Sequence, residues 1–314
     1  ILSGLVGSEM CIRDSFATGW SVFVDDSAEL GLDDVRSQRN QFLPLDDLAF
    51  TYPPSDKAVW LRFDVPEHQA PYWLWLFAPR VQFLDYYLLN GELIEQTVHS
   101  GESMPMSSRP LPSRAYLMSL PNDGQAREVY VRMTSNHPLM AWFKVIDEAE
   151  LVSLEKPAYL FGALLGALLL VVVYNLIRFA YIRSACSLWL AGLHAGLAVC
   201  AAANLGLLAA WVPRLGYNQS LIADTSALIA AFCLSAFVLG FFRNTPMQRS
   251  KLNLVLQGHA LVTLLLGLTI LLTGLLWYSA VVYLLVFLGT LAVLLVSGVH
   301  LSLIHISEPT RPER

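Results

Sequence analysis

Between residues 157 and 300 the sequence holds six basic residues and a single acidic one, Asp224. A soluble domain usually contains about 25% charged residues, whereas this whole chain contains 14% charged and 55% apolar residues. Such a long stretch with so little charge predicts a membrane-embedded region. One span needs about 20 apolar residues. We predict five spans, at 158–177, 185–210, 221–242, 252–276 and 280–299.

Residues 16–156 have a different character, with 20 acidic and 11 basic residues and therefore a net charge of −9. This contrast predicts an aqueous domain followed by a membrane domain, and it excludes a purely soluble enzyme. The aqueous part has no basic patch, which excludes a nucleic-acid-binding protein. It also has no cysteine, so we expect no disulfide framework there. The remaining cysteines outside the first 15 residues lie in apolar runs, where they act as small hydrophobic side chains.

The two ends of the chain are similar to translated oligonucleotide sequence. Residues 5–15 and 301–311 resemble translations of the two strands of one transposase-type sequencing adaptor. We therefore predict that 1–15 and 301–314 are artefacts, and they are left out of the fold prediction.

The aqueous part has the pattern of short β-strands. Residues 59–65 and 128–134 alternate between apolar and polar side chains, as half-buried strands do. Several short strands with turn residues between them predict a β-sandwich or jelly roll over 16–150, followed by a linker at 151–157. We predict strands at 59–65, 72–77, 81–89, 93–98, 128–134 and 139–146, a tight turn at Asn90-Gly91 and a short helical turn at 33–39.

A series of short motifs follows a fixed order in both parts of the chain. In the aqueous part they are the run 20–26, Phe42-Leu43-Pro44, the runs 59–63 and 84–88, Gly101, Pro105, Arg109, Arg114 and the run 129–132. In the membrane part they are the run 162–174, Asn175, Arg178, Tyr181, Trp211-Val212-Pro213 and Phe242-Arg243.

The order and spacing of these motifs resemble the bacterial seven-transmembrane receptors with diverse intracellular signalling modules, with the type 2 extracellular sensor domain. The resemblance implies an all-β jelly-roll or β-sandwich extracellular domain followed by an α-helical transmembrane bundle, of whose seven helices five are present. It also implies a small ligand, with carbohydrate as a candidate. The family's output modules, such as a diguanylate cyclase or a histidine kinase, follow the membrane helices and are absent from this sequence.

The basic residues indicate how the chain is oriented in the membrane. Five of the six lie in the two joins 178–184 and 243–251, and only Arg214 lies on the opposite side. Short cytoplasmic loops are enriched in Lys and Arg. We therefore expect a multi-pass protein of the bacterial inner (plasma) membrane, with the N-terminal domain in the periplasm.

Candidate ligand-binding residues are aromatic and arginine side chains that share a strand face. Trp60 and Arg62 lie on one face of their strand, opposite Leu61, and Arg132 is placed in the same way on a second strand. Trp73 and Trp75 share the face of a third. Sugar binding needs aromatic faces beside hydrogen-bond donors. These five residues are therefore the predicted ligand-binding set.

Structural roles are the alternative for each of these residues. The aromatic side chains have a competing role in packing the core or the junction with the membrane. Arg62 and Arg132 have a competing role in ion pairs with Asp64 or Glu128, which stabilise the sheet without binding a ligand. These alternatives stay open at the level of sequence.

Polar residues inside predicted spans are costly and are functional candidates. Asp224 is expected near the outer face, where it binds an ion, pairs with Arg214 or is simply reached by water. Asn175 and His259 are candidates for hydrogen bonds between helices.

We therefore predict a sensory receptor fragment that binds a small molecule outside and signals through its helices. The alternative is a membrane-anchored envelope protein or a transporter, although proline is absent from 158–212 and 247–300, and broken helices mark many transporters. No metal site is predicted, because His68, His99 and His137 lack paired spacing and are expected in surface loops. No catalytic residue is predicted, because the spacing of the Ser and His residues selects no nucleophile–base arrangement, and no cofactor is expected. The expected partners are the ligand, the lipid bilayer and, as a candidate assembly, a second copy of the chain.

Overall fold

The computed structural model describes residues 17–154, 156–209, 219–243 and 251–273, with a few helical residues between 286 and 298. The chain divides into two compact units, one made of residues up to 135 and 139–155 and the other of 136–138 and the residues from 156 onward. The predicted adaptor-derived ends and most of the predicted span 280–299 lie outside the described residues.

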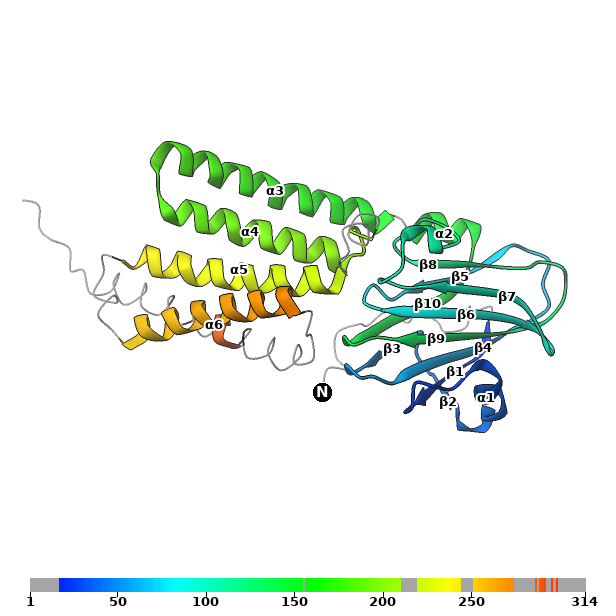
Figure 1. The fold of residues 1–314 in the computed structure, drawn as a ribbon. Coiled ribbons are helices and arrows are strands. Elements are labelled where there is room, and N and C mark those ends of the chain that lie inside the picture. Colours follow the sequence, from blue (N-terminus) through cyan, green and yellow to red (C-terminus); the bar gives the residue numbers. More distant parts are fainter. Residues whose placement is uncertain are drawn as a thin grey trace, which may run out of the picture. The chain divides into compact units, whose positions relative to one another are not determined.

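The first unit is a sandwich of two antiparallel sheets (Figure 1). The six-stranded sheet has the order β2-β1-β4-β9-β6-β7 and the four-stranded sheet has the order β3-β10-β5-β8. The predicted β-sandwich is thus confirmed. The strands are β1 (Thr18–Asp25), β2 (Leu43–Pro44), β3 (Ala49–Tyr52), β4 (Ala58–Val65), β5 (Tyr72–Phe77), β6 (Phe83–Asn90), β7 (Leu93–Ser100), β8 (Tyr116–Leu120), β9 (Arg127–Thr134) and β10 (Leu139–Asp147).

The main core lies between the two sheets and is built from the apolar positions of the alternating strands. Leu61 on β4 faces Val131 on β9, and both are fully buried. Leu74 and Leu76 on β5 enter the same core from the four-stranded sheet. Because successive side chains of a strand point to opposite faces, burial of Leu61 directs Trp60 and Arg62 to the outside of the six-stranded sheet.

A second apolar cluster covers part of that outer face. It is formed where α1 (Leu32–Ser37) packs Leu32 and Val35 against Trp60, Leu89 and Tyr130 of the sheet. The short helix η2 (Arg39–Gln41) follows α1 directly. The segment between β1 and β2 is therefore anchored on the sheet by its own small core.

Two turns depend on glycine. Gly91 has a φ of 62° in the β6–β7 hairpin, at the predicted Asn90-Gly91 turn. Gly101, which follows β7 and precedes η3 (Met106–Ser108), has a φ of 145°. A Cβ atom on Gly101 would lie 2.1 Å from the carbonyl oxygen of Gln82, so the backbones of the two segments approach too closely for any other residue.

The sandwich ends in the short helix α2 (Glu148–Leu154), which overlaps the predicted linker 151–157. Lys144 on β10 pairs with Glu150 of α2 over 2.5 Å. The side chain of Asp147 accepts a hydrogen bond from the Glu150 backbone N–H over 2.7 Å, and Arg114 donates to the carbonyl oxygen of Leu154 over 3.3 Å. The helix is thus tied to β10 near its first residues and to the segment that leads into β8 at its last residue.

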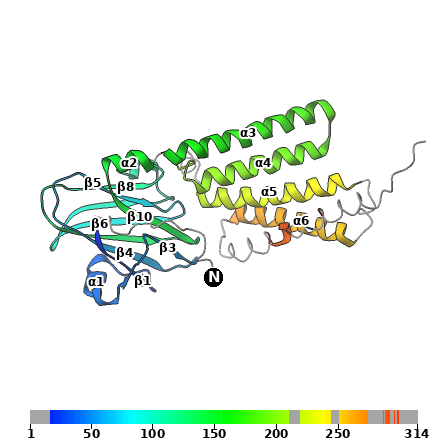
Figure 2. The ribbon, with the colours of Figure 1, turned by 180° about the vertical axis from the view of Figure 1, so that it is seen from behind.

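The second unit contains the helices α3 (Lys156–Ile182), α4 (Ala185–Asn204), α5 (Gln219–Phe241) and α6 (Lys251–Thr273). Helices that follow one another in the chain pack side by side, as both ribbon views show (Figures 1 and 2). Within the described residues, each of these four helices contains or belongs to a stretch long and apolar enough to cross a membrane. They correspond to the first four predicted spans. A small-residue contact brings α4 and α5 together, because Gly196 lies against the backbone of Ser226.

Candidate functional site

The predicted ligand-binding residues divide between the two outer faces of the sandwich. Trp60, Arg62 and Arg132 lie on the outer face of the six-stranded sheet, where Trp60 and Arg132 are cross-strand neighbours. Trp73 and Trp75 lie on the outer face of the four-stranded sheet, next to β8 and β10. The five residues therefore belong to two separate surfaces.

Trp60 is covered by α1 and has no exposed surface. Its ring centre lies 6.2 Å from that of Tyr87, with the two rings nearly parallel. Within the described part of the chain, its indole N–H has no hydrogen-bond acceptor. In this structure Trp60 packs against Leu32 and Val35 of α1, and its role in binding a ligand stays a prediction.

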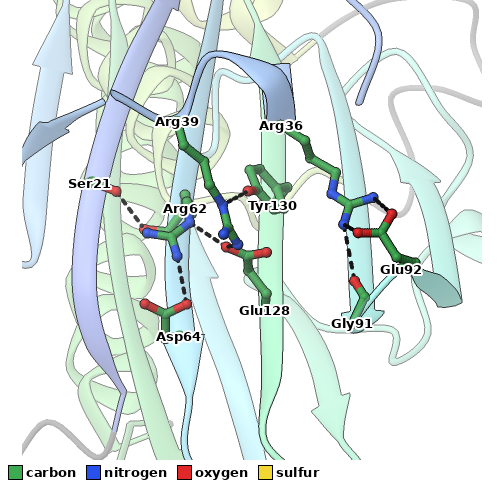
Figure 3. A network of polar contacts seen from close by, with 9 residues as sticks. All are labelled: Ser21, Arg36, Arg39, Arg62, Asp64, Gly91, Glu92, Glu128 and Tyr130. Carbon is green, nitrogen blue, oxygen red and sulfur yellow. Dashed lines mark hydrogen bonds and ion pairs between the residues drawn. The ribbon is translucent and has the colours of Figure 1, made fainter. Parts of the chain in front are cut away.

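Arg62 is the centre of a charged network on the same face (Figure 3). Its Nε donates to Glu128 Oε1 over 2.5 Å, and its guanidinium also bonds Asp64 Oδ1 over 2.8 Å. Arg39 of η2 donates to the same Glu128 oxygen and also to the Tyr130 hydroxyl. The ion pairs that sequence offered as the alternative role of Arg62 are therefore present, with Arg39 as an additional member.

The network sets the ionisation of its carboxyl groups. Burial raises the pKa of Glu128, but hydrogen bonds from Arg39 and Arg62 outweigh burial and hold that pKa below its ordinary value. Burial keeps the pKa of Asp64 above its ordinary value, although the charge of Arg62 opposes the shift. Glu128 is consequently ionised at neutral pH and presents a fixed negative charge.

A cavity of about 390 Å³ opens beside this network. Its charged lining is balanced, with three arginines and three carboxylates contributed by different segments. Such a surface offers donors and acceptors together, which suits a polar ligand without net charge. The lining residues are Thr18, Arg36, Arg39, Asp64, Val65, Pro66, Gly91, Glu92, Ala126, Arg127 and Glu128.

The arginines of the cavity are held in place by other groups. Arg36 donates to the Gly91 carbonyl oxygen over 3.1 Å and pairs with Glu92, as Figure 3 shows. Arg127 is almost completely buried and pairs with Glu95 and Asp123, both over 2.6 Å. Because these contacts fix the side chains before any ligand arrives, the cavity is preorganised.

Sequence reasoning did not find Arg36 or Arg39 as site residues. Both belong to the segment that was predicted only as a helical turn, and their positions depend on how α1 docks on Trp60. Arg132, by contrast, was predicted. It pairs with Asp85 over 3.3 Å and donates to the Ala28 carbonyl oxygen over 2.7 Å, so that it holds the chain leading into α1.

The outer face of the four-stranded sheet carries a second group of aromatic side chains. Alternate positions of β5 are occupied by Trp73, Trp75 and Phe77, and Trp142 on β10 is the cross-strand neighbour of Phe77. Trp73, Trp75 and Phe77 are partly exposed, and Trp142 is 39% exposed. This face therefore presents several aromatic rings to solvent, whereas Trp60 on the other outer face is fully covered.

The predicted intramembrane polar residues lie in separate places. Asn175 donates to the Val171 carbonyl oxygen of its own helix over 2.9 Å. His259 of α6 makes the expected contact between helices, because its Nδ1 lies 2.8 Å from the Ser235 hydroxyl of α5. Asp224 is buried, and its Oδ2 lies 3.7 Å from Nδ1 of His137, whose loop belongs to the same compact unit. Arg214, its predicted partner, lies outside the described residues.

The histidines of the sandwich do not match the expectation of exposed loops. His68 and His137 are buried, and only His99 is exposed. The His68 Nδ1 lies 3.0 Å from the Pro66 carbonyl oxygen, a local contact that keeps the ring against the protein. Across the described residues, the histidine, cysteine and acidic side chains form no group of three or more that could hold a metal ion.

A β-sandwich followed by helices that are long and apolar enough to cross a membrane is the arrangement of a multi-pass membrane protein with a domain outside the bilayer. Comparison with family models gives its class more closely. Residues 17–147 match the 7TMR-DISM extracellular 2 domain, and residues 157–309 match the domain described as 7TM diverse intracellular signalling. The chain belongs to this family of seven-transmembrane sensory receptors with diverse intracellular signalling modules. Both matched domains are receptor domains and neither is catalytic.

Among solved structures, the chain is similar to the carbohydrate-binding module TmCBM61 in complex with beta-1,4-galactotriose. The identity is 11%, the alignment covers 43% of this chain and 92% of that one, and the TM-score is 0.24. The search of curated proteins gave no match.

Proposed function

We propose that this receptor binds a small, polar, uncharged ligand in the cavity beside the Arg62–Glu128 network, and that carbohydrates are the first class to test. Binding outside would shift the arrangement of the membrane helices. A C-terminal output module, such as a diguanylate cyclase or a histidine kinase, would receive that shift. The membrane is the inner membrane of a bacterium, with the sandwich in the periplasm.

The balanced charge of the cavity is the observation that carries this proposal. Arg36, Arg39 and Arg127 line the same cavity of about 390 Å³ as Asp64, Glu92 and Glu128. A sugar hydroxyl both donates and accepts, so it can bond an arginine and a carboxylate at the same time. A ligand with a full charge would meet as much repulsion as attraction.

The position of the cavity also supports a role in sensing. One wall belongs to the α1–η2 segment and the other walls belong to the sandwich. A ligand that bridges the walls would stabilise this segment in its docked position, because it adds contacts that exist only in that state.

The test is calorimetric titration of the whole chain in lipid nanodiscs with sugars, amino acids and organic acids. For the ligand that binds, Arg39→Ala removes a lining side chain and should weaken affinity roughly 10- to 100-fold, which corresponds to the loss of a charge-assisted hydrogen bond. Arg62 lies beside the cavity and holds Glu128, so Arg62→Ala should weaken affinity by a smaller factor. The Arg132 side chain lies on the same face of the sheet, and Arg132→Ala tests whether this predicted residue also contributes to affinity. Lys57→Ala is the matched control, because Lys57 pairs with Asp26 and does not line the cavity.

Two outcomes would contradict the proposal. In the first, no sugar binds and a charged compound does. In the second, a sugar binds with unchanged affinity to the arginine variants while their thermal midpoints fall, which would assign these side chains to stability alone.

A further inference from the structure

The outer face of the four-stranded sheet carries an aromatic row, which we define as Trp75, Phe77 and Trp142. The ring centres of Trp75 and Phe77 are 6.1 Å apart and their planes differ by 13°. Those of Phe77 and Trp142 are 5.9 Å apart. The inward-facing neighbours Leu74 and Leu76 are 1% exposed, whereas Trp142 is 39% exposed. The sandwich core is therefore complete without these rings.

Two basic side chains flank the row. The guanidinium carbon of Arg114 lies 5.8 Å from the centre of the Phe77 ring, and Lys144 is the cross-strand neighbour of Trp75. Both are partly exposed. Hydrogen-bond donors therefore stand directly beside the aromatic faces.

These two basic side chains also hold α2. Lys144 pairs with Glu150, and Arg114 donates to the carbonyl oxygen of Leu154. α2 ends at Leu154 and the first membrane helix, α3, begins at Lys156. A ligand that contacts Lys144 or Arg114 therefore acts on the attachment of the segment that enters the membrane.

We infer that the aromatic row, with Arg114 and Lys144, is a second binding surface, which takes the sugar rings of a neutral oligosaccharide. The inference goes beyond the proposed cavity and does not depend on it. A pyranose ring has an apolar C–H face that packs on an aromatic ring and a rim of hydroxyl groups that accept from arginine and lysine. Three rings about 6 Å apart suit a ligand of several linked sugars.

The charges on this face favour a neutral chain over an acidic one. Lys144 already has Glu150 as its partner, and Arg114 already donates to a carbonyl oxygen. Residues 16–156 carry a net charge of −9, which repels an anionic polymer.

The experiment uses the whole chain in nanodiscs and a panel of neutral oligosaccharides, namely β-1,4-linked glucose, xylose, galactose and N-acetylglucosamine chains and α-1,4-linked glucose chains. Binding is followed by calorimetry and by tryptophan fluorescence. Trp75→Ala and Trp142→Ala should each weaken the binding about tenfold, the effect of losing one aromatic packing contact. Trp142→Phe keeps an aromatic face and should retain most of the affinity.

Two controls separate binding at the aromatic row from binding elsewhere on the sandwich. Phe83→Ala removes another exposed aromatic side chain, 44% exposed, from the six-stranded sheet and should leave the binding unchanged. Lys57→Ala, which changes neither the cavity nor the row, should also leave oligosaccharide binding unchanged. Hydrogen exchange of the α2 amides, residues 148–154, should slow or quicken when the oligosaccharide is present.

The inference is overturned if no oligosaccharide of the panel binds to the folded protein. It is equally overturned if binding survives both tryptophan-to-alanine substitutions. Binding that depends on the row but leaves α2 exchange unchanged would keep the surface and refute its link to α2.

Discussion

Arg62 on β4 donates from Nε to Oε1 of Glu128 on the neighbouring strand β9 over 2.5 Å. The same oxygen accepts from Arg39 of η2, so one carboxylate joins the sheet to the segment that covers it. Removing the negative charge would leave two arginines facing each other on a face that is only partly open to solvent. Glu128 thus stabilises the sheet and also keeps one wall of the cavity in place.

Glu128→Gln should therefore lower the free energy of unfolding of the sandwich by about 1–3 kcal/mol, the range for hydrogen bonds that involve a charged group. Glu92→Gln is the matched control, because the Glu92 side chain is 96% exposed and its pair with Arg36 spans 3.4 Å. Exposed pairs of this kind contribute less than about 1 kcal/mol. Urea unfolding of the detergent-solubilised protein, followed by tryptophan fluorescence, measures both. Equal losses for the two variants would refute the special role of Glu128.

Gly101→Ala should destabilise the sandwich by about 3 kcal/mol or more, because the new Cβ would meet the Gln82 carbonyl oxygen at 2.1 Å and the backbone φ is 145°. Gly91→Ala has a positive φ as well but meets no atom within 4 Å, so its cost should be about 1 kcal/mol. The difference between the two thermal midpoints isolates the steric contact. A Gly101→Ala protein as stable as Gly91→Ala would show that the β6 and β7 ends can separate without cost.

The stability of the sandwich should fall as the pH drops from about 4 to about 2. Hydrogen bonds from Arg127 lower the pKa of Asp123 from 3.8 to about 2, and Arg127 also holds the pKa of Glu95 below its ordinary value. A carboxyl group whose pKa is lower in the folded state than in the unfolded state contributes stability above its unfolded pKa, and the contribution disappears as the pH falls through the folded pKa.

Thermal midpoints recorded across this pH range test the prediction, with Asp123→Asn expected to show a smaller fall than the wild type. Asp56→Asn removes an exposed carboxylate for which no ion pair is found in the described structure. Its thermal midpoint should fall with pH as steeply as that of the wild type. If the thermal midpoints of all three proteins fall equally with pH, the acid sensitivity arises from carboxyl groups other than Asp123.

Labelling with an impermeant thiol reagent checks the orientation of the chain. In a background without Cys11, Cys186, Cys200 and Cys233, Asn122→Cys in the sandwich should be labelled in cells with a permeabilised outer membrane. Gln248→Cys, in a join rich in basic residues, should be labelled only after the inner membrane is broken. The reverse pattern would invert the proposed topology.

The hydrogen bond between Ser235 and His259 joins α5 to α6 and should contribute modestly to helix packing. Ser235→Ala is expected to lower stability by about 0.6 kcal/mol, the average for such bonds in membrane helices. Ser226→Ala is the control, because within the described helices that hydroxyl bonds the Ala223 carbonyl oxygen of its own helix. Unfolding measured in mixed micelles would separate the two. An effect of Ser226→Ala as large as that of Ser235→Ala would contradict a contribution from the bond to His259.

Sequence alternation predicted the strands whose two faces differ in solvent exposure. The predicted run 72–77 coincides with β5, and 59–65 and 128–134 each differ from β4 and β9 by one residue. No such pattern marks β8, which is buried on nearly all of its length, or the two-residue β2. Their pairing depends on contacts with distant strands, which a local pattern does not contain.

The candidate site was predictable only in part for the same reason. Alternation correctly directed Trp60, Arg62 and Arg132 away from the main core. It could not show that α1 covers Trp60, nor that Arg39 reaches Glu128, because both follow from the docking of a separate segment. Arg132 has Asp85 as its carboxylate partner, which sequence did not propose. The ligand-binding roles of all five residues stay predictions.

The α1–η2 segment rests on its own apolar cluster, outside the main core, and supplies Arg36 and Arg39 to the cavity. Its outward-facing residues can therefore change without disturbing the packing between the two sheets. Under natural selection, such a segment lets a receptor acquire a new ligand through a few local substitutions while the scaffold and its attachment to the membrane are inherited intact. The same separation makes residues 32–41 the natural place to begin when redesigning the proposed binding cavity.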